Sequence, residues 1–357
     1  MNRLLAHALI FALILLCCHD DALSQKKPKW RTRTRLQVSY EFDDNIRENP
    51  ADSSETTGDS SLRLLFHSRA TRRSARSALA FEVQGGLQTY LNNAIENKLI
   101  NEIKASAATR VGAVQIGVRS SGRLKIYLSD VLDYATGAAE LFLRPPGVLG
   151  FGNELRLGAE GLVYNSFPIY DSSVVRFGWT VSRKLTSRVS WRASVSRSQI
   201  FYDRNAFVFD PEPDRLEVLV RKQRDRNWQV QTHFNYTRKF LLDFTYSFQH
   251  NGSNSTGYTF DMHQFVLVFG LPLSDKLWLR VYGAAQLKDY TEDSLPIFPR
   301  DIDPERDESN FFILDLSRDL SSNLSALLRF AYYNNESVIR SRFYRKSLFM
   351  LGFDFRF

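Results

Sequence analysis

The sequence predicts an all-β fold: a closed antiparallel transmembrane β-barrel of about sixteen strands, with fourteen or eighteen also allowed. Three observations support this prediction. Apolar and polar residues alternate along most of the chain, as they do in strands with one apolar face. Short turns and longer polar loops alternate between those strands. After the first 24 residues, no stretch approaches the roughly 18 uncharged apolar residues that a spanning helix needs.

The chain is expected to begin with a secretory signal peptide, followed by the barrel at residues 25–357. Arg3 provides a short positive start, residues 4–18 form an apolar run, and a small-x-small cleavage site ends at Ser24. This order is typical of signal peptides, and the apolar run is too short to span a membrane as a helix. We therefore expect cleavage near Ser24, with residues 1–24 removed.

Composition excludes several classes of function. Both cysteines, Cys17 and Cys18, lie in the expected signal peptide, so the exported chain should contain no disulfide, thiolate nucleophile or cysteine metal ligand. The formal net charge is +8, which in a soluble protein would suggest nucleic acid. An exported chain meets lipopolysaccharide phosphates instead. Outer-membrane lipid and lipopolysaccharide are therefore the expected partners, and neither nucleic acid nor a cofactor is expected.

The first strand shows the alternation clearly, because Leu36, Val38, Tyr40 and Phe42 share one face. A membrane strand needs about 9–11 residues, and residues 114–128 keep their parity for longer than that. The same period of two recurs in the apolar sets Leu79/Phe81/Val83, Val114/Ile116/Val118, Leu155/Leu157/Ala159, Val175/Phe177/Trp179/Val181, Val189/Trp191/Ala193/Val195, Trp228/Val230/Phe234/Tyr236, Leu242/Phe244/Tyr246/Phe248, Leu279/Val281 and Leu328/Phe330/Tyr332.

Aromatic residues make up 13% of the chain, and many of them lie at the ends of the expected strands. Membrane barrels carry girdles of aromatic residues at the two membrane interfaces. The sequence therefore predicts interfacial girdle positions at Tyr40, Phe42, Tyr90, Tyr164, Phe201, Tyr236, Tyr290 and Tyr332.

The connections predict eight hairpins, and hence sixteen strands. Short turns are expected at residues 72–74, 109–110, 183–186, 238–239, 272–275 and 319–322. Longer polar loops are expected at residues 44–59, 92–97, 166–172, 204–214, 251–257, 291–309 and 334–341. Residues 131–152 are poorly patterned, although Leu141 and Leu143 can serve as a strand. Residues 216–236 are too long for one crossing, and we interpret them as one strand that projects beyond the membrane.

The chain ends on a strand whose alternate residues, from position 349 to position 357, are apolar. This end resembles the assembly signal of bacterial outer-membrane barrels, although that signal has a polar residue where Met350 stands. The resemblance implies a Gram-negative outer-membrane location and recognition by the barrel-assembly machinery. The residues that carry it are Gly352, Phe353, Phe355 and Phe357.

The polar face of each strand is expected to line the interior. About sixteen strands leave an aqueous lumen unless something plugs it. Ions are costly to bury unpaired, so either water or oppositely charged groups should lie beside them. The charges are therefore either cross-strand ion pairs that brace the wall or a mildly basic constriction that favours anionic solutes. The expected lining residues are Arg33, Arg35, Arg119, Arg123, Arg156, Arg176, Arg192, Arg280, Arg329, Glu82, Glu160 and Asp243.

Two charged segments outside the lumen wall also have alternative interpretations. The acidic loop at residues 291–309 either folds into the lumen as a constriction or remains solvent-exposed. The basic run at residues 221–226 places Lys222, Arg224 and Arg226 on the lipid-facing parity of Trp228. These side chains either contact lipopolysaccharide phosphates or form a solvated strand extension.

A possible catalytic motif at residues 250–255 (HNGSNS) resembles the His-x-Ser-Asn stretch of outer-membrane phospholipases and lipid A deacylases. Here one extra residue separates His250 from Ser253, which places them on opposite faces of a strand. We therefore expect no enzyme and no catalytic residue. The remaining histidines are isolated, so no metal site is expected.

A second resemblance concerns two short motifs. Residues 38–45 (VSYEFDDN) look like the opening strand of porin-like barrels in exopolysaccharide-export and surface-assembly systems. Residues 253–258 (SNSTGY) are similar to an outer loop of the same group. The export members usually carry a periplasmic helical-repeat domain, so the resemblance implies that a separate export-system subunit supplies it.

Fold alone does not determine function. The expected function is an outer-membrane porin-like channel for hydrophilic solutes. One alternative is the outer-membrane conduit of a polysaccharide or surface-component export system. The other is a closed barrel that acts as an anchor or assembly factor.

Overall fold

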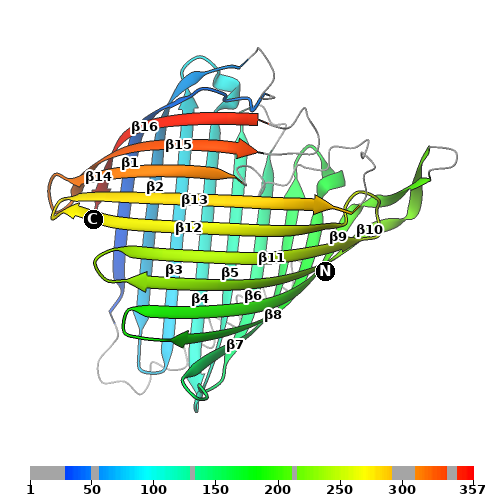
Figure 1. The fold of residues 1–357 in the computed structure, drawn as a ribbon, viewed down its shortest axis with the longest axis horizontal. Helices are drawn as coiled ribbons and strands as arrows, with labels where there is room; N and C mark the ends of the chain where they lie inside the picture. The colour runs from blue at the N-terminus through cyan, green and yellow to red at the C-terminus, as the bar shows by residue number, and fades with distance from the viewer. Residues whose placement is uncertain (1–28, 50–55, 129–132, 211–214, 292–309, 336–343) are drawn as a thin grey trace.

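The predicted closed barrel of sixteen antiparallel strands is confirmed by the computed structural model (Figure 1). Each strand pairs with its neighbours in the chain, and β1 (Arg31–Asp43) pairs with β16 (Tyr344–Arg356) to close the ring. Within the described residues, no helix is long and apolar enough to cross a membrane. The structure describes residues 29–49, 56–128, 133–210, 215–291, 310–335 and 344–357.

The other strands follow in chain order, each antiparallel to the one before it. They are β2 (Asp59–Arg73), β3 (Ser77–Tyr90), β4 (Lys98–Val111), β5 (Val114–Tyr127), β6 (Tyr134–Arg144), β7 (Phe151–Tyr164), β8 (Ser172–Lys184), β9 (Val189–Asp210), β10 (Arg215–Thr237), β11 (Leu241–Ser253), β12 (Phe260–Ser274), β13 (Leu277–Tyr290), β14 (Phe311–Asp319) and β15 (Leu324–Asn335). Two short 3-10 helices, η2 (Ala94–Glu96) and η3 (Pro168–Tyr170), follow β3 and β7.

The apolar face of the strands points outward, as the alternation predicts. On β1, Val38, Tyr40 and Phe42 expose 41%, 48% and 43% of their surface, whereas Ser39 and Glu41 between them expose 3% and 1%. Soluble monomers rarely leave so much contiguous apolar surface in water. A barrel whose outer wall is apolar and whose inner wall is polar is suited to a lipid bilayer.

The turns lie at one end of the barrel, here called the turn end, and the loops lie at the other, the loop end (Figure 1). One predicted turn was misplaced, and one turn was missed. Residues 109–110 belong to β4, and the chain reverses after them at Gly112, whose φ of 60° suits glycine. The turn at residues 145–150 was not predicted, and there Leu149 and Gly150 adopt positive φ angles of 53° and 78°.

The two uncertain segments of the sequence are now placed. Leu141 and Leu143 lie on β6, so the poorly patterned stretch contributes one strand. Residues 216–236 fall within β10, which pairs with the similarly long β9 to form a hairpin that projects beyond the rest of the barrel (Figure 1). The prediction of one long strand is therefore confirmed. The expected signal peptide and nearly all of the acidic loop at residues 291–309 lie outside the described residues.

Among the described residues, apolar packing inside the barrel is limited to small clusters. One cluster joins β15 and β16 through Leu327, Ala331, Tyr333, Leu348 and Met350. Met350, which departs from the assembly-signal pattern, is buried in it. The other inner surfaces of the described strands are mainly polar, so the barrel surrounds a cavity rather than a conventional core.

Candidate functional site

The candidate site is the lumen, which contains two adjoining cavities. The larger, cavity 1, has a volume of about 1240 Å³ and runs along β1 to β5 and β13 to β16. The smaller, cavity 2, has a volume of about 620 Å³ and lies against the loop-end halves of β4 to β13. Glu102, Arg123 and Tyr134 line both cavities, so the two spaces meet at these side chains.

The walls of both cavities carry more basic than acidic side chains. Cavity 1 is lined by ten Lys or Arg residues and by seven Asp or Glu residues. Cavity 2 is lined by four basic and three acidic residues. The walls are therefore of mixed charge with a basic surplus, and a low-dielectric wall concentrates the field of such a surplus in the lumen.

The structure places the predicted lining residues in three settings. Arg35, Arg123, Arg176, Arg280, Arg329 and Glu160 line the cavities. Arg119 and Arg156 lie in an ion-pair cluster on β5 to β7. Glu82 lies 3.4 Å from His67, Asp243 lies 2.8 Å from His233, and Arg33 and Arg192 are exposed. The polar faces thus point inward, but the predicted residues do not gather at one constriction.

Cross-strand ion pairs account for part of the wall charge. Arg329 donates two hydrogen bonds to Asp315, at 2.6 and 2.8 Å, in the fork geometry that suits guanidinium and carboxylate. Arg119 lies 2.7 Å from Glu140 and 2.9 Å from Glu154. Such pairs brace adjacent strands, and the unequal numbers of basic and acidic residues leave a positive excess.

The β5–β7 ion-pair cluster surrounds an inward-facing aromatic ring near the turn end. The guanidinium groups of Arg119 and Arg144 lie over the ring of Phe142, 4.1 and 4.9 Å from its centroid. Both arginines also pair with Glu154. Gly117 lies opposite Phe142, and a Cβ there would collide with the ring. Glycine thus makes room for a charged and aromatic group at the turn end of β5 to β7.

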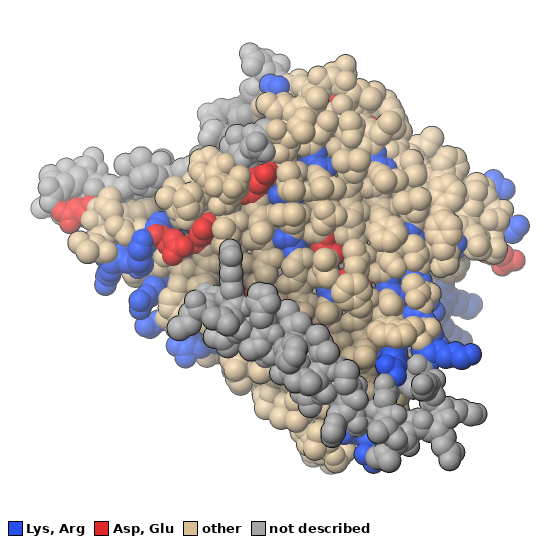
Figure 2. All heavy atoms as spheres, turned by 180° about the vertical axis from the view of Figure 1, so that it is seen from behind, with Lys and Arg blue, Asp and Glu red and all other residues tan. Residues whose placement is uncertain are grey.

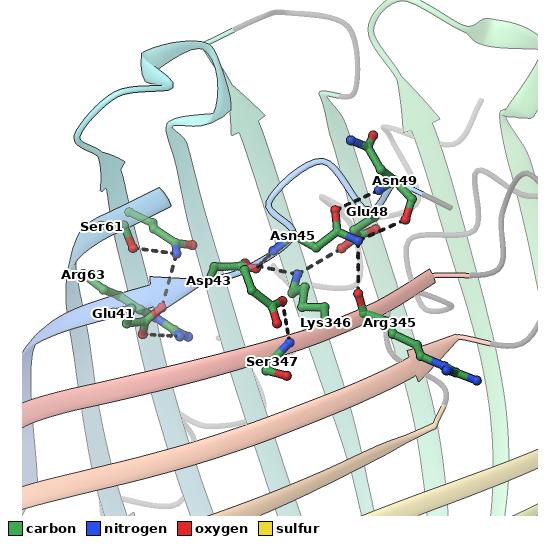
Figure 3. Close-up of polar contacts among 12 residues, drawn as sticks. Glu41, Asp43, Asn45, Glu48, Asn49, Ser61, Arg63, Arg345, Lys346 and Ser347 are labelled. Carbon is green, nitrogen blue, oxygen red and sulfur yellow. Dashed lines mark hydrogen bonds and ion pairs between the residues drawn. The ribbon is translucent and has the colours of Figure 1, made fainter. Parts of the chain in front are cut away.

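Two buried polar groups lie beside the closing pair of strands (Figure 3). The first is centred on Glu41, which accepts a hydrogen bond from Arg63 Nη1 at 2.9 Å and another from Gln88 Nε2 at 3.2 Å. Gln88 Nε2 also lies 3.1 Å from Ser61 Oγ. These contacts join β1, β2 and β3 on the inner wall of cavity 1.

The second group, here called the latch, consists of Asp43, Asp44, Asn45, Glu48 and Lys346. Lys346 Nζ on β16 lies 3.1 Å from Glu48 and 3.5 Å from Asp43 (Figure 3). A backbone N–H of β16, at Ser347, donates to Asp44 Oδ1 at 2.7 Å. Pairing offsets the cost of burying these ions. The latch therefore ties the segment after β1 to the start of β16.

Asn45 organises the segment that the latch holds. Its Nδ2 donates to the carbonyl oxygens of Asn49 and Arg345, each at 3.0 Å, and its Oδ1 accepts the Asn49 N–H at 2.9 Å. Ile46, Glu48 and Asn49 line cavity 1. Residues 44–49 therefore form part of the cavity wall at the loop end. The motif at residues 38–45 thus contributes buried polar residues to the closing seam and its latch.

Part of the predicted aromatic girdle instead faces the lumen. Tyr40 and Tyr332 are exposed on the outer wall, as expected of girdle residues. Tyr90 lines cavity 1, Tyr290 lines cavity 2, and Tyr164 is buried against two other tyrosines in a cluster. The interfacial prediction for these three was wrong because it used their position at strand ends and not their parity. They share the parity of the inward polar residues.

The basic run on β10 lies on the outer surface. Lys222, Arg224 and Arg226 are exposed, whereas Gln223 and Asp225 between them are buried. Figure 2 shows Lys and Arg side chains gathered at the base of the projecting hairpin. The parity that the sequence predicts for this run is therefore present, above the outward-facing Trp228 of the same strand.

The candidate enzyme motif is not assembled. His250 is exposed on the outer face, where its Nδ1 lies 2.7 Å from Asp261, while Ser253 donates to the buried Asp225 at 2.6 Å. The two side chains therefore belong to separate hydrogen-bonded pairs. Among the described residues, no three His, Cys, Asp or Glu side chains form a group that could hold a metal ion.

Comparison with known proteins identifies the fold. No known family profile matches the sequence, and no curated protein matches it significantly. The anion-selective porin from Comamonas acidovorans superposes with a TM-score of 0.51 at 9% identity, covering 93% of this chain and 100% of that one. OprB from Pseudomonas putida superposes with a TM-score of 0.50 at 10% identity, covering 92% of this chain and 94% of that one. The chain therefore has the fold of the Gram-negative outer-membrane porins.

Proposed function

We propose that this chain is an outer-membrane channel through which hydrophilic solutes diffuse, with a preference for anions. The observation that carries the proposal is the hollow lumen whose walls hold more basic than acidic side chains. Charged side chains that line a narrow aqueous path set its selectivity. The Comamonas acidovorans protein is itself described as anion-selective. The preference proposed here rests on the lining of this chain.

The proposal includes export after cleavage near Ser24 and insertion by the barrel-assembly machinery, as the C-terminal resemblance implies. The porin fold and the apolar outer wall support this location. The conduit and anchor alternatives share that fold, so function must be tested by transport and not by location.

The decisive experiment is electrical recording of the purified, refolded barrel in a planar bilayer. We expect stable open steps whose size rises with salt, and a reversal potential in a salt gradient that reports net anion permeation. Cation selectivity would contradict the proposed preference. An absence of conductance from correctly folded barrels would contradict the open channel and would favour the conduit or anchor alternatives.

Arg123 provides the first mutational prediction, because it lines both cavities. Arg123→Glu changes the local charge by two units. Such a change about 10 Å from a permeating ion is worth about 0.8 kcal/mol in water, or roughly fourfold in anion permeability. We therefore expect the reversal potential to shift toward cations at low salt. Arg238→Glu, on an exposed turn, makes the same charge change outside the lumen and should leave selectivity unchanged.

We also propose that the outer basic run on β10 binds lipopolysaccharide phosphates. Lys222, Arg224 and Arg226 are exposed above the apolar wall, where such phosphates lie, and Arg224 lies 5.6 Å from the centroid of Phe201. Charge-assisted contacts to phosphate are stronger than neutral ones. Outward basic and aromatic groups together fit a headgroup above its acyl chains.

The corresponding prediction uses the double variant Arg224→Gln/Arg226→Gln. Each lost charge-assisted contact is worth about 1.5–3 kcal/mol, so lipopolysaccharide binding to the folded barrel in detergent should weaken by at least about tenfold. High salt should erase most of the difference. The control Arg188→Gln/Arg238→Gln removes the same charge from exposed turns. Equal binding by all three proteins would disprove this assignment.

A further inference from the structure

A set of aromatic rings faces the lumen at the loop end, and each ring lies under a cationic side chain. We call this set the collar. Its cations are Lys125, Arg204 and Lys288. Its rings are Tyr127, Tyr134, Tyr170, Tyr202, Tyr258, Phe260 and Tyr290. Every one of these ten residues lines cavity 1 or cavity 2, so the collar belongs to the inner wall.

The tightest station of the collar is on β12 and β13. Lys288 Nζ lies 3.6 Å from the centroid of Phe260 and 4.7 Å from that of Tyr290. These two rings are themselves paired across the strands, with their centroids 5.6 Å apart. A cation within about 6 Å of a ring face is attracted by the ring quadrupole. The two rings therefore hold the ammonium group of Lys288 at a defined place on the wall of cavity 2.

The second station joins β9, η3 and the loop before β12. The guanidinium of Arg204 lies 4.6 Å from the centroid of Tyr202 and 4.8 Å from that of Tyr258. Gln223 Oε1 accepts a hydrogen bond from Arg204 Nε at 2.7 Å. Asp225, the carboxylate near Gln223, accepts hydrogen bonds from the neutral side chains of Ser253, Asn251 and Gln223. Arg204 is thus fixed in orientation by neutral partners and by rings.

The third station lies where the two cavities meet. Lys125 Nζ lies 4.8 Å from the centroid of Tyr127 and 5.8 Å from that of Tyr134, which lines both cavities. The three stations thus lie on β5 and β6, on β9 with η3 and the loop before β12, and on β12 and β13. A solute moving past the loop end meets repeated combinations of a flat ring, a phenol hydroxyl and a positive charge.

This combination is more than a small anion requires. A hydrated inorganic anion responds to the charge but gains nothing from a ring face. A neutral sugar can place its apolar C–H face on a ring and its hydroxyls on tyrosine, but it makes no use of the cations. A sugar ring that carries a carboxylate uses all three features, because charge-assisted bonds to a carboxylate are the strong ones. Six of the seven collar rings are tyrosines, which combine an apolar face with a polar tip.

We propose that the collar is a binding site for acidic saccharides, that is, oligosaccharides of uronic-acid-type sugars, at the loop end of the lumen. The assignment rests on the proposed channel function and specifies its solute class. The ring surfaces that the cations leave uncovered hold the sugar faces, the tyrosine hydroxyls bond the sugar hydroxyls, and the three cations receive the carboxylates.

The test is the block of ionic current by trigalacturonate, with the neutral trisaccharide maltotriose and a mononucleotide as comparison probes. Trigalacturonate should interrupt the current of the wild-type channel in discrete events at concentrations at least about tenfold below maltotriose. Equal block by the two saccharides would overturn the role of the cations. Stronger block by the mononucleotide than by the acidic saccharide would overturn the assignment to saccharides.

Two collar variants locate the site. Lys288→Gln removes the charge and shortens the side chain by one atom, and Tyr290→Ala removes one of the rings that contact Lys288. Each should raise the half-blocking concentration of trigalacturonate by about tenfold, while only the ring variant should also weaken maltotriose. Lys276→Gln, on the exposed turn between the same two strands, is the matched control. Unchanged block in both collar variants would overturn the site.

Direct binding separates this inference from the channel proposal. Equilibrium dialysis of trigalacturonate with the folded barrel in detergent requires no conductance, and heat-modifiable migration verifies that each variant is folded. If the folded barrel shows no conductance but binds trigalacturonate in a Lys288-dependent manner, the channel proposal is contradicted and the binding site is supported. If the barrel conducts ions but binds neither saccharide, the binding-site proposal is contradicted and the channel proposal is supported.

Discussion

Deletion of residues 355–357 is expected to reduce the folded barrel by about tenfold or more, both in cells and on refolding. These residues complete the pairing of β16 with β1, in which Phe357 N donates to the Thr34 carbonyl oxygen at 2.9 Å and Thr34 N donates back at 3.3 Å. Without them the seam ends early and leaves unpaired backbone groups, each costing several kcal/mol where water is excluded. Heat-modifiable migration in electrophoresis measures the folded fraction.

A second variant separates closure of the ring from recognition of the C-terminus. Phe355→Leu/Phe357→Leu keeps the backbone pairs and the apolar parity but removes the terminal aromatic signal. It should refold in lipid or detergent as the wild type does, yet accumulate poorly in the outer membrane of cells, since the resemblance implies that the assembly machinery reads aromatic residues. Wild-type levels of folded deletion variant would contradict the closure argument. Wild-type levels of the leucine variant in cells would contradict the signal.

Asn45→Ala is expected to loosen residues 44–49, which the latch holds against the cavity wall, and so to enlarge the channel. The side chain makes three hydrogen bonds, to Asn49 twice and to Arg345 once. At about 1 kcal/mol for each bond, their loss weakens the fold of residues 44–49 and its tie to β16 by roughly 3 kcal/mol in total. Because these residues line cavity 1, single-channel conductance and current noise should both rise.

The control for this prediction is Asn323→Ala, which removes the same side chain from an exposed turn at the opposite end. Its conductance and noise should match those of the wild type. Unchanged conductance in Asn45→Ala, measured on barrels of verified fold, would mean that the segment stays in place without its asparagine. In that case the ion pairs of Lys346 would be sufficient to hold the latch.

The strands could be predicted from the sequence because their information is local. A strand with one face in lipid and one face inward needs only alternation, as on β1 and β16, and this pattern does not depend on which strands are neighbours. The long β10 was predicted for the same reason. The turn after β4 was misplaced because arginine and threonine near a strand end can extend the strand, and only Gly112 tolerates the left-handed reversal well.

The collar shows an error that arises when aromatic residues are assigned to the membrane interface from their position at strand ends. Tyr290 lies at the end of its strand, where a girdle residue would lie, but it has the parity of Gln286 and Lys288, which line cavity 2. Its parity alone would have predicted that the Tyr290 side chain faces the lumen. Parity could not have shown that Phe260 and Tyr290 share one cation, because that contact depends on the register between β12 and β13.

The amino-acid pattern by itself predicted a closed antiparallel barrel of about sixteen strands and its inner and outer faces. The faces follow from a period of two within single strands, and the approximate strand count follows from the alternation of short turns and longer loops. The tertiary structure alone decided which inward side chains meet. Lys346 and Glu48 are 298 positions apart in the chain and become partners only when the last strand pairs with the first. Closure sets the register of every strand pair, and register brings the latch, the ion pairs and the collar together.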